Sequence, residues 1–180
     1  MKTCLILLLF LFPANLWAQT ELENFHTRKQ QITTRGMTAL TSWAVANLAI
    51  GTYEGIKLDK SENKYFSIMN AAWNIVNLPI GLIAIIKAKK DNVPESWEKM
   101  AQYQRSTERT YLINGGLDVG YMASGATLML VSDNSKRPEL LKGIGQSILF
   151  QGAFLFVFDF VEYGLHKAHR KKHKPNLYEL

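Results

Sequence analysis

The sequence is almost without cysteine: Cys4, the only one, lies in an apolar run near the start of the chain. We expect that run to be removed during export, which would leave a mature chain with no cysteine. Disulfide bonds, cysteine-ligated metals and thiol nucleophiles are then excluded. A lipid-anchored mature N-terminus is excluded as well, because lipidation requires a cysteine at the cleavage point.

The sequence also lacks the patterns of β-structure and of common catalytic folds. No segment alternates apolar and polar residues as a half-buried strand does. The phosphate-binding loop, the dinucleotide-binding glycine pattern, the zinc-protease pattern H-E-x-x-H and the nucleophile elbow G-x-S-x-G are all missing. We therefore expect an all-α, non-enzymatic protein without a cofactor.

Basic residues outnumber acidic ones, 21 to 15, and the sequence pI is about 9.4. They lie in short stretches between long apolar blocks rather than in one cluster. Segments that flank membrane spans have this distribution of Lys and Arg. The pattern favours a lipid bilayer as partner and argues against nucleic acid.

Residues 1–18 have the three parts of a secretory signal peptide. Lys2 supplies the positive charge, residues 4–12 form the apolar core, and Pro13 ends that core ahead of Ala18. The core is too short to cross a bilayer by itself, and a small residue at the cleavage point is typical of such signals. The alternative is an uncleaved anchor helix that ends at Ala18.

Residues 19–36 form a polar, amphipathic lead-in. Its apolar and long side chains repeat at helical spacing, at Leu22, Phe25, Lys29 and Ile32. We expect this segment to be a helix that leads into the first apolar block.

Four apolar blocks follow, at residues 37–53, 65–86, 111–132 and 140–165. Their lengths and their Ala, Leu, Gly and Ile content predict helices that can cross a membrane. We expect a four-helix antiparallel transmembrane bundle over residues 37–165 and a basic tail at residues 166–180. The Asn, Gln, Ser and Gly within the blocks leave a soluble periplasmic four-helix bundle as the alternative.

Two rules predict opposite orientations for such a bundle in the membrane. A cleaved signal peptide places the mature N-terminus outside the cytoplasm, and four spans then place the tail outside too. Most Lys and Arg residues would face outward, against the preference for basic residues on the cytoplasmic side. We favour the signal peptide and location in the bacterial inner membrane; an uncleaved first helix would reverse the orientation.

The second and third blocks share a polar pattern that suggests an internal duplication. Residues 70–81 and 114–125 each run polar, small, small, apolar, polar, and end in glycine. The spacing puts the polar members on one helical face. These members are Asn70, Asn74, Asn77, Asn114 and Asp118.

Two interpretations of these polar faces are open. Amides and carboxyls avoid lipid, so the faces should turn inward and hydrogen-bond to one another while small residues let the helices approach closely. In the second interpretation they line a cavity that binds a small ligand or an ion, with Asp118 as its charged centre.

The fourth block ends in a stripe of carboxylates and imidazoles. Its members, spaced by three and four residues, include Asp159, Glu162, His166 and His169. Such spacing can place several ligands on one metal ion. The interleaved Lys and Arg residues argue against a cation, and a basic tail at anionic headgroups explains the same residues.

Three features together carry a resemblance to known sequences. They are the signal ending in Ala-Gln, the segment W-N-x-x-N-x-x-x-G at residues 73–81, and the segment N-x-G-L-D-x-G-Y at residues 114–121. The chain resembles small uncharacterised four-helix membrane proteins of Bacteroidota, which are known only as domains of unknown function. The resemblance implies a small helical protein of the cell envelope and no activity.

These observations favour a non-enzymatic integral membrane protein that acts through helix packing or partner binding, as a homo-oligomer or with another membrane protein. The alternative is a ligand- or ion-binding membrane protein, such as a transporter component, with an intramembrane site lined by Asn and Asp. A membrane enzyme that uses the acidic residues and the tail histidines ranks third.

The signal peptide leads to a prediction about processing. Cleavage after Ala18 should give a mature protein that begins at or near Gln19. Mass spectrometry of the membrane fraction measures this directly. Recovery of the intact Met1 terminus as the major form would show that the first segment is retained.

Overall fold

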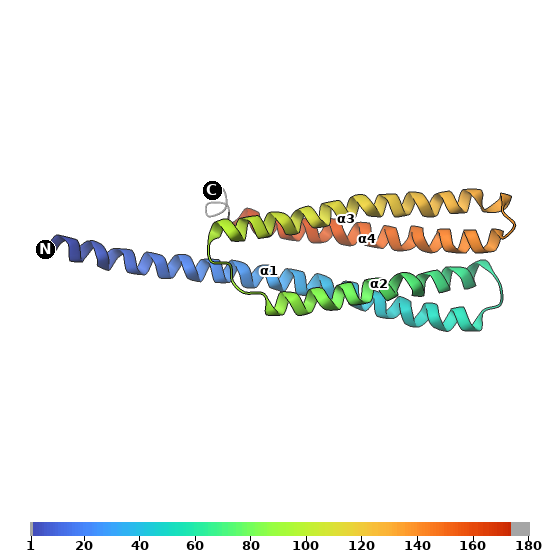
Figure 1. Cartoon of the computed structure of the whole chain (residues 1–180), viewed down its shortest axis with the longest axis horizontal. Helices are drawn as coiled ribbons and strands as arrows, with labels where there is room; N and C mark the ends of the chain where they lie inside the picture. The colour runs from blue at the N-terminus through green and yellow to red at the C-terminus, as the bar shows by residue number, and fades with distance from the viewer. Residues whose placement is uncertain (1, 174–180) are drawn as a thin grey trace.

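The computed structural model describes the backbone of residues 2–173 and the side chains of residues 19–173. Four long helices make up this part of the chain, α1 (Lys2–Lys57), α2 (Glu62–Lys90), α3 (Trp97–Val131) and α4 (Pro138–Lys172), with the short 3-10 helix η1 (Ser132–Asn134) after α3 (Figure 1). The described residues contain no strand. The all-α, four-helix prediction is confirmed; cleavage after Ala18 stays a prediction, and residues 174–180 of the tail lie outside the described residues.

Polar residues set the boundaries of the helices. The side chains of Ser61 and Ser96 each accept a hydrogen bond from the backbone N–H three residues later, 3.3 Å away in both cases. This is the usual way to satisfy a free N–H at a helix start. Pro138 lies in the first turn of α4, where its missing N–H costs nothing.

The lead-in at residues 19–36 is helical, as expected. It is continuous with the first apolar block, because α1 runs through both. Its helical spacing is confirmed, since Leu22, Phe25, Lys29 and Ile32 are all buried. Residues 97–110, ahead of the third apolar block, form the first part of α3.

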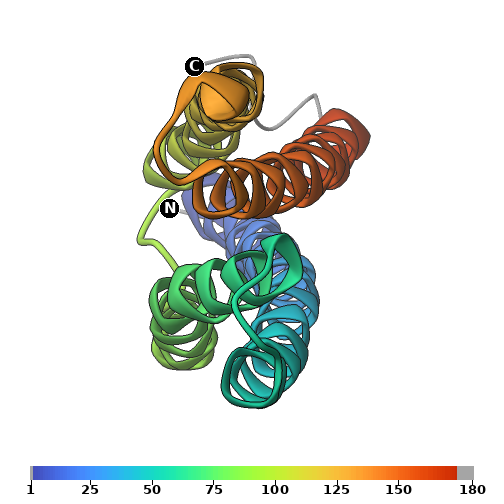
Figure 2. The same ribbon diagram turned by 90° about the vertical axis from the view of Figure 1, so that its right-hand side faces the viewer.

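The helices form two antiparallel hairpins, α1 with α2 and α3 with α4. The hairpins meet mainly where α2 packs against α4, with smaller contacts from α1 to α4 and α3 (Figure 2). In the described part of the chain no Cα atom of α2 lies within 8 Å of one of α3. The side of the bundle between α2 and α3 is therefore where space can open.

Glycines let the helix backbones approach within each hairpin. A Cβ on Gly125 would lie 2.6 Å from the carbonyl oxygen of Gly145, and one on Gly51 would lie 2.5 Å from that of Ser67. No side chain fits at either position. The small residues of the sequence therefore serve close helix packing, as expected.

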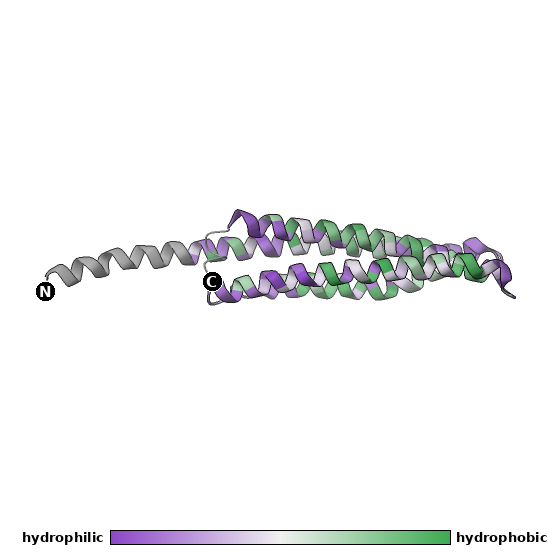
Figure 3. Cartoon of the chain, turned by 90° about the horizontal axis from the view of Figure 1, so that it is seen from above, coloured by the Kyte–Doolittle hydropathy of each residue, from purple (hydrophilic) through white to green (hydrophobic). Residues whose placement is uncertain are grey.

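The interior of α2, α3 and α4 holds few large apolar side chains. Buried positions there are mostly polar or small, including Ser67, Asn70, Asn74, Gln104, Asp118, Ser147, Gln151, Asp159 and Glu162. Large apolar side chains lie on the outside instead, for example Ile75, Ile83, Leu130, Val157 and Val161. Figure 3 shows the hydrophobic colour along the middle of the helices and the hydrophilic colour towards the ends.

One end of the bundle has an ordinary apolar core. Leu22 and Phe25 of α1 pack there against Met100 and Ala101 of α3, with Trp97 at the edge. This is the end that contains the lead-in, the α2–α3 connection and the end of α4. The bundle thus has a conventional core at that end and a polar interior along the apolar blocks.

Two of the four helices, α2 and α4, are long and apolar enough to cross a membrane by length and composition. The described parts of α1 and α3 are not apolar enough to meet the same criterion of length and mean hydropathy. These two helices, α2 and α4, support the membrane-spanning prediction in part.

The glycine contacts predict a difference between two positions of α3. Gly125→Ala should lower the free energy of unfolding by about 1–3 kcal/mol, because its methyl group meets the backbone of α4. Gly120→Ala is the matched control: nothing lies within 4 Å of the new methyl group, so we expect no loss of stability and a gain of up to ~1 kcal/mol from helix propensity. Thermal unfolding in detergent compares the two. Equal destabilisation by both changes would contradict close packing at Gly125.

Candidate functional site

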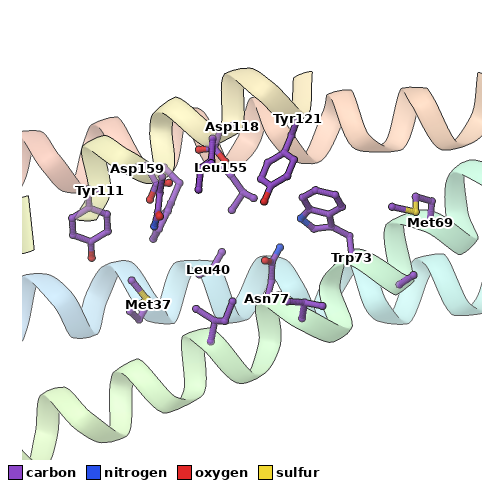
Figure 4. A pocket seen from close by; sticks show the side chains of 16 residues that line it. Met37, Leu40, Met69, Trp73, Asn77, Tyr111, Asp118, Tyr121, Leu155 and Asp159 are labelled. Atoms are coloured by element: carbon purple, nitrogen blue, oxygen red, sulfur yellow. The ribbon is translucent and has the colours of Figure 1, made fainter. Parts of the chain in front are cut away.

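A pocket of about 530 Å³ lies between the two hairpins, in the middle of the bundle (Figure 4). All four helices contribute to its wall. The lining residues are Met37, Leu40, Met69, Ala72, Trp73, Val76, Asn77, Ile80, Tyr111, Asn114, Leu117, Asp118, Tyr121, Leu155, Phe158 and Asp159. Its volume is within the range of small-molecule sites.

Two carboxyl groups give this pocket its polarity. Asp118 of α3 and Asp159 of α4 are both buried, and they lie close enough to hydrogen-bond to each other. Two carboxyl groups in such contact share a proton, because two adjacent carboxylates repel each other. Among the described residues, no amide or hydroxyl group donates a hydrogen bond to Oδ2 of Asp118, although that oxygen is buried.

Aromatic rings and amides complete the wall. Trp73 of α2 and Tyr121 of α3 meet edge to face, with ring centroids 5.0 Å apart, across the opening between their helices. Asn77 is buried, whereas Asn114 is exposed although it borders the pocket. Asn114 therefore lines the pocket without being packed in the interior of the bundle. The remaining lining is mostly apolar, so the pocket suits an apolar molecule that carries one polar or charged group.

Asn70 and Asn74 lie outside the pocket, in a hydrogen-bonded network. Asn70 donates to Oδ1 of Asn47 on α1 at 2.6 Å and accepts a short hydrogen bond from Gln151 on α4. Gln151 in turn accepts from Nε1 of Trp43 at 3.0 Å. This network joins α1, α2 and α4 through buried polar groups, as the packing interpretation of Asn70 expects.

The other two asparagines of α2 bond within their own helix. Asn74 donates to the carbonyl oxygen of Asn70 at 2.8 Å, and Asn77 donates to Oδ1 of Asn74 at 3.4 Å. Neither joins a neighbouring helix through these bonds. Of the five predicted residues, Asn70 bridges helices, while Asn77, Asn114 and Asp118 line the pocket.

The carboxylate and imidazole stripe of α4 follows the buried side of that helix. Glu162 and His166 are buried, with Oε2 and Nε2 3.9 Å apart. His169 points elsewhere, its Nε2 3.1 Å from the carbonyl oxygen of Phe25 and its ring stacked on that phenyl group. No three His, Cys, Asp or Glu side chains of the described residues converge as metal ligands, so the structure gives no support to a metal at Asp159, Glu162, His166 and His169.

Gly36 of α1 makes room for the carboxyl group of Glu162. The Cβ of any larger residue at position 36 would overlap the carbon and both oxygens of that group. The carboxyl group therefore rests on the backbone of α1. Among the described residues, no group donates a hydrogen bond to the buried Oε2 of Glu162.

Several residues around the stripe were not identified from the sequence. Arg170 pairs with Glu108 at 2.8 Å, Gln104 donates to the carbonyl oxygen of His166 at 3.0 Å, and Tyr111 stacks on the His166 ring. Each contact joins α3 to α4 across many residues of sequence. Such long-range pairs cannot be predicted from a local sequence pattern.

The lead-in contains a buried lysine, Lys29. Lys29 is 4% exposed and its Nζ lies 3.4 Å from the centre of the Tyr103 ring. Burial lowers the pKa of Lys29 to about 8, and the charge of Asp91 acts in the opposite direction. Burial, aided by a hydrogen bond to Asp91 and the charge of Asp91, raises the pKa of the half-exposed Tyr103 to about 12.

Comparison with known proteins gives a family and nothing beyond it. The sequence pattern of DUF6992, described as a family of unknown function, matches residues 39–160. No curated protein and no solved structure matches the chain. The matched range includes all the residues that line the pocket except Met37.

The lowered pKa of Lys29 predicts how stability depends on pH. Between pH 8 and 10 the folded protein holds Lys29 neutral while the unfolded chain still binds that proton, so stability should rise with pH by roughly 2 kcal/mol. Above pH 10 the raised pKa of Tyr103 acts in the opposite direction. Thermal unfolding of the protein and of Lys29→Met between pH 8 and 10 measures the effect.

The variant Lys29→Met should lose this rise, whereas Lys99→Met, at an exposed lysine, should keep it. A rise of the same size in Lys29→Met would show that another group is responsible.

Proposed function

The chain belongs to the DUF6992 family of unknown function, and we propose that it is an integral membrane protein whose inter-hairpin pocket binds a small apolar molecule with one polar or charged group. The observation that carries this proposal is the pocket itself. It combines mostly apolar walls with a buried carboxyl pair, one oxygen of which, Asp118 Oδ2, has no amide or hydroxyl donor in the described part of the chain.

The membrane setting is supported by the distribution of side chains. Along the apolar blocks, polar and small residues are buried while Ile, Val and Leu are exposed. In water this arrangement forgoes the main stabilising force of a helical bundle, whereas in lipid it shields amides and carboxyls. Helices α2 and α4 have the length and composition of membrane spans.

We further propose that α1 and α3 cross the membrane beside them. Each of these helices forms an antiparallel hairpin with one of the two apolar helices, so residues 37–53 and 111–132 lie at the same depth as the spans. Their polar residues face the protein interior at Asn47 and Asp118. A bacterial inner membrane, reached through the signal peptide, is the location this favours.

Lateral access is a further reason to assign a ligand to this pocket. In the described residues the backbones of α2 and α3 stay apart and the two helices meet through the rings of Trp73 and Tyr121, with the pocket between them. A molecule dissolved in the bilayer could enter between these helices without crossing water. Action through packing alone is less well supported, because Asn77 and Asn114 border the pocket and Asn77 bonds only within its own helix in the described residues.

Binding of a neutral probe tests the proposal. Triphenylphosphine oxide is apolar and carries one hydrogen-bond acceptor, which a protonated carboxyl group can serve. We expect it to bind the purified protein in equilibrium dialysis, and we expect Ala72→Phe to weaken binding at least ~10-fold by filling the pocket. Ala123→Phe is the matched control, since Ala123 is exposed on α3 and does not line the pocket.

Equal binding by the protein, Ala72→Phe and Ala123→Phe would place the probe elsewhere. That result would refute the proposed function, and so would failure of the unmodified protein to bind both this neutral probe and a cationic probe of similar shape.

A further inference from the structure

We propose that the molecule bound in the pocket is a lipophilic cation, and that it replaces the proton shared by Asp118 and Asp159, which leaves through Glu162 and His166. This inference rests on the proposed function and names the ligand class and the exchange that accompanies binding. Its basis is the charge of the pocket, the free carboxyl oxygen and the line of buried protonatable groups behind it.

The pocket is complementary to positive charge. Asp118 and Asp159 are acidic, and no Lys, Arg or His is among the described residues that line it. Trp73, Tyr111 and Tyr121 also contribute aromatic rings. Aromatic faces attract cations, most strongly where water is excluded, and carboxylates supply the opposite charge.

One buried carboxyl oxygen in the pocket wall has no amide or hydroxyl donor among the described residues. Asp118 is 3% exposed and lines the pocket, yet within the described part of the chain its Oδ2 lacks an amide or hydroxyl donor. A buried polar atom without such a partner is costly in the empty site. A bound cationic group would remove that cost.

The exchange conserves the charge of the site. Before binding, one proton on two carboxyl groups leaves a net charge of minus one. Binding of a monovalent cation breaks the O–H bond, and the two carboxylates with the cation again carry minus one. An uncompensated charge within a membrane is expensive, so an exchange that leaves the net charge unchanged is favoured.

The released proton has a route along α4. Glu162 lies one helical turn beyond Asp159, and its Oε2 is 3.9 Å from Nε2 of His166. That nitrogen is 3.4 Å from Oγ1 of Thr33, which is half-buried on α1. In the described residues Glu162 Oε2 and His166 Nδ1 have no hydrogen-bond partner, so both can accept a proton in transit.

Other helices place titratable groups against this route. From α1, Lys29 acts on His166 through its charge. From α3, Tyr111 stacks on His166 and Glu108 pairs with Arg170 of α4. His169 of α4 is the next imidazole, and its Nε2 contacts the Phe25 carbonyl group. The route therefore ends among ionisable groups near the basic end of the bundle.

A set of probes that differ in charge tests the inference. Tetraphenylphosphonium and tetraphenylborate have the same shape and opposite charges, and triphenylphosphine oxide is neutral. We expect tetraphenylphosphonium to bind with an apparent affinity that rises with pH by up to about tenfold per pH unit, and to release about one proton, as linkage requires. Equilibrium dialysis gives the affinity, and an indicator dye in weak buffer gives the proton count.

Variants then separate the site from the route. Asp118→Asn and Asp159→Asn should abolish proton release and weaken tetraphenylphosphonium binding by at least about tenfold. Glu162→Gln and His166→Gln should leave its affinity within about twofold but slow proton release in stopped flow by about tenfold or more. His173→Gln, a change at a histidine outside the route, is the matched control and should slow nothing.

The outcomes are distinguishable. Binding of the neutral probe together with tetraphenylphosphonium binding that is independent of pH and releases no proton would refute this inference and leave the proposed function standing. Preference for tetraphenylborate would refute it too. Failure of all three probes to bind would refute both this inference and the proposed function. If a variant does not fold, the pH dependence of tetraphenylphosphonium binding to the unmodified protein still tests the inference.

Discussion

The inward placement of amide and carboxyl groups is the constraint on which most of this structure depends. Each apolar block carries polar residues on one face, and the bundle turns those faces inward. Asn70 illustrates the consequence, because both ends of its amide are used in bonds to α1 and α4. Glycines at positions such as 125 and 145 then let backbones approach closely enough for dispersion forces to hold the hairpin together. Among the described residues, the apolar core cluster lies at the lead-in end, around Phe25 and Met100.

The pocket follows from how the hairpins dock. They meet through α2 and α4 and leave α2 apart from α3 in the described part of the chain. The polar face of α3 therefore has no amide partner on α2, and Asp118 pairs with Asp159 of its own hairpin instead. The same docking places the apolar face of Trp73 opposite Tyr121. A site for a small molecule arises where the polar faces of the two halves fail to meet, and this is why the ligand proposal and the packing of the bundle have one physical origin.

Helix positions could be predicted from the sequence because they depend on local order: apolar blocks, the caps at Ser61 and Ser96, and Pro138. The buried face of the lead-in was equally clear from the spacing of Leu22, Phe25 and Ile32. The sequence did not show which polar residues bridge helices and which line the pocket. Whether an asparagine bridges helices or borders a pocket depends on the docking of two hairpins, and the partner of Asn70, Gln151, is 81 residues away. Asn114 shows the limit, since it matches Asn70 in pattern yet is exposed.

The central claim is that the apolar outer faces of the bundle contact lipid. Single spin labels test it most directly, on cysteines introduced at Ile83 and Val157, which are 51% and 60% exposed, in a chain carrying Cys4→Ser and reconstituted in bilayers. Power-saturation EPR compares the access of oxygen, which concentrates in lipid, with that of a water-soluble nickel chelate. The account predicts that oxygen dominates at both positions, while the chelate dominates at a label on exposed Asp133 in the α3–α4 connection. Equal access of the chelate at all three positions would contradict it.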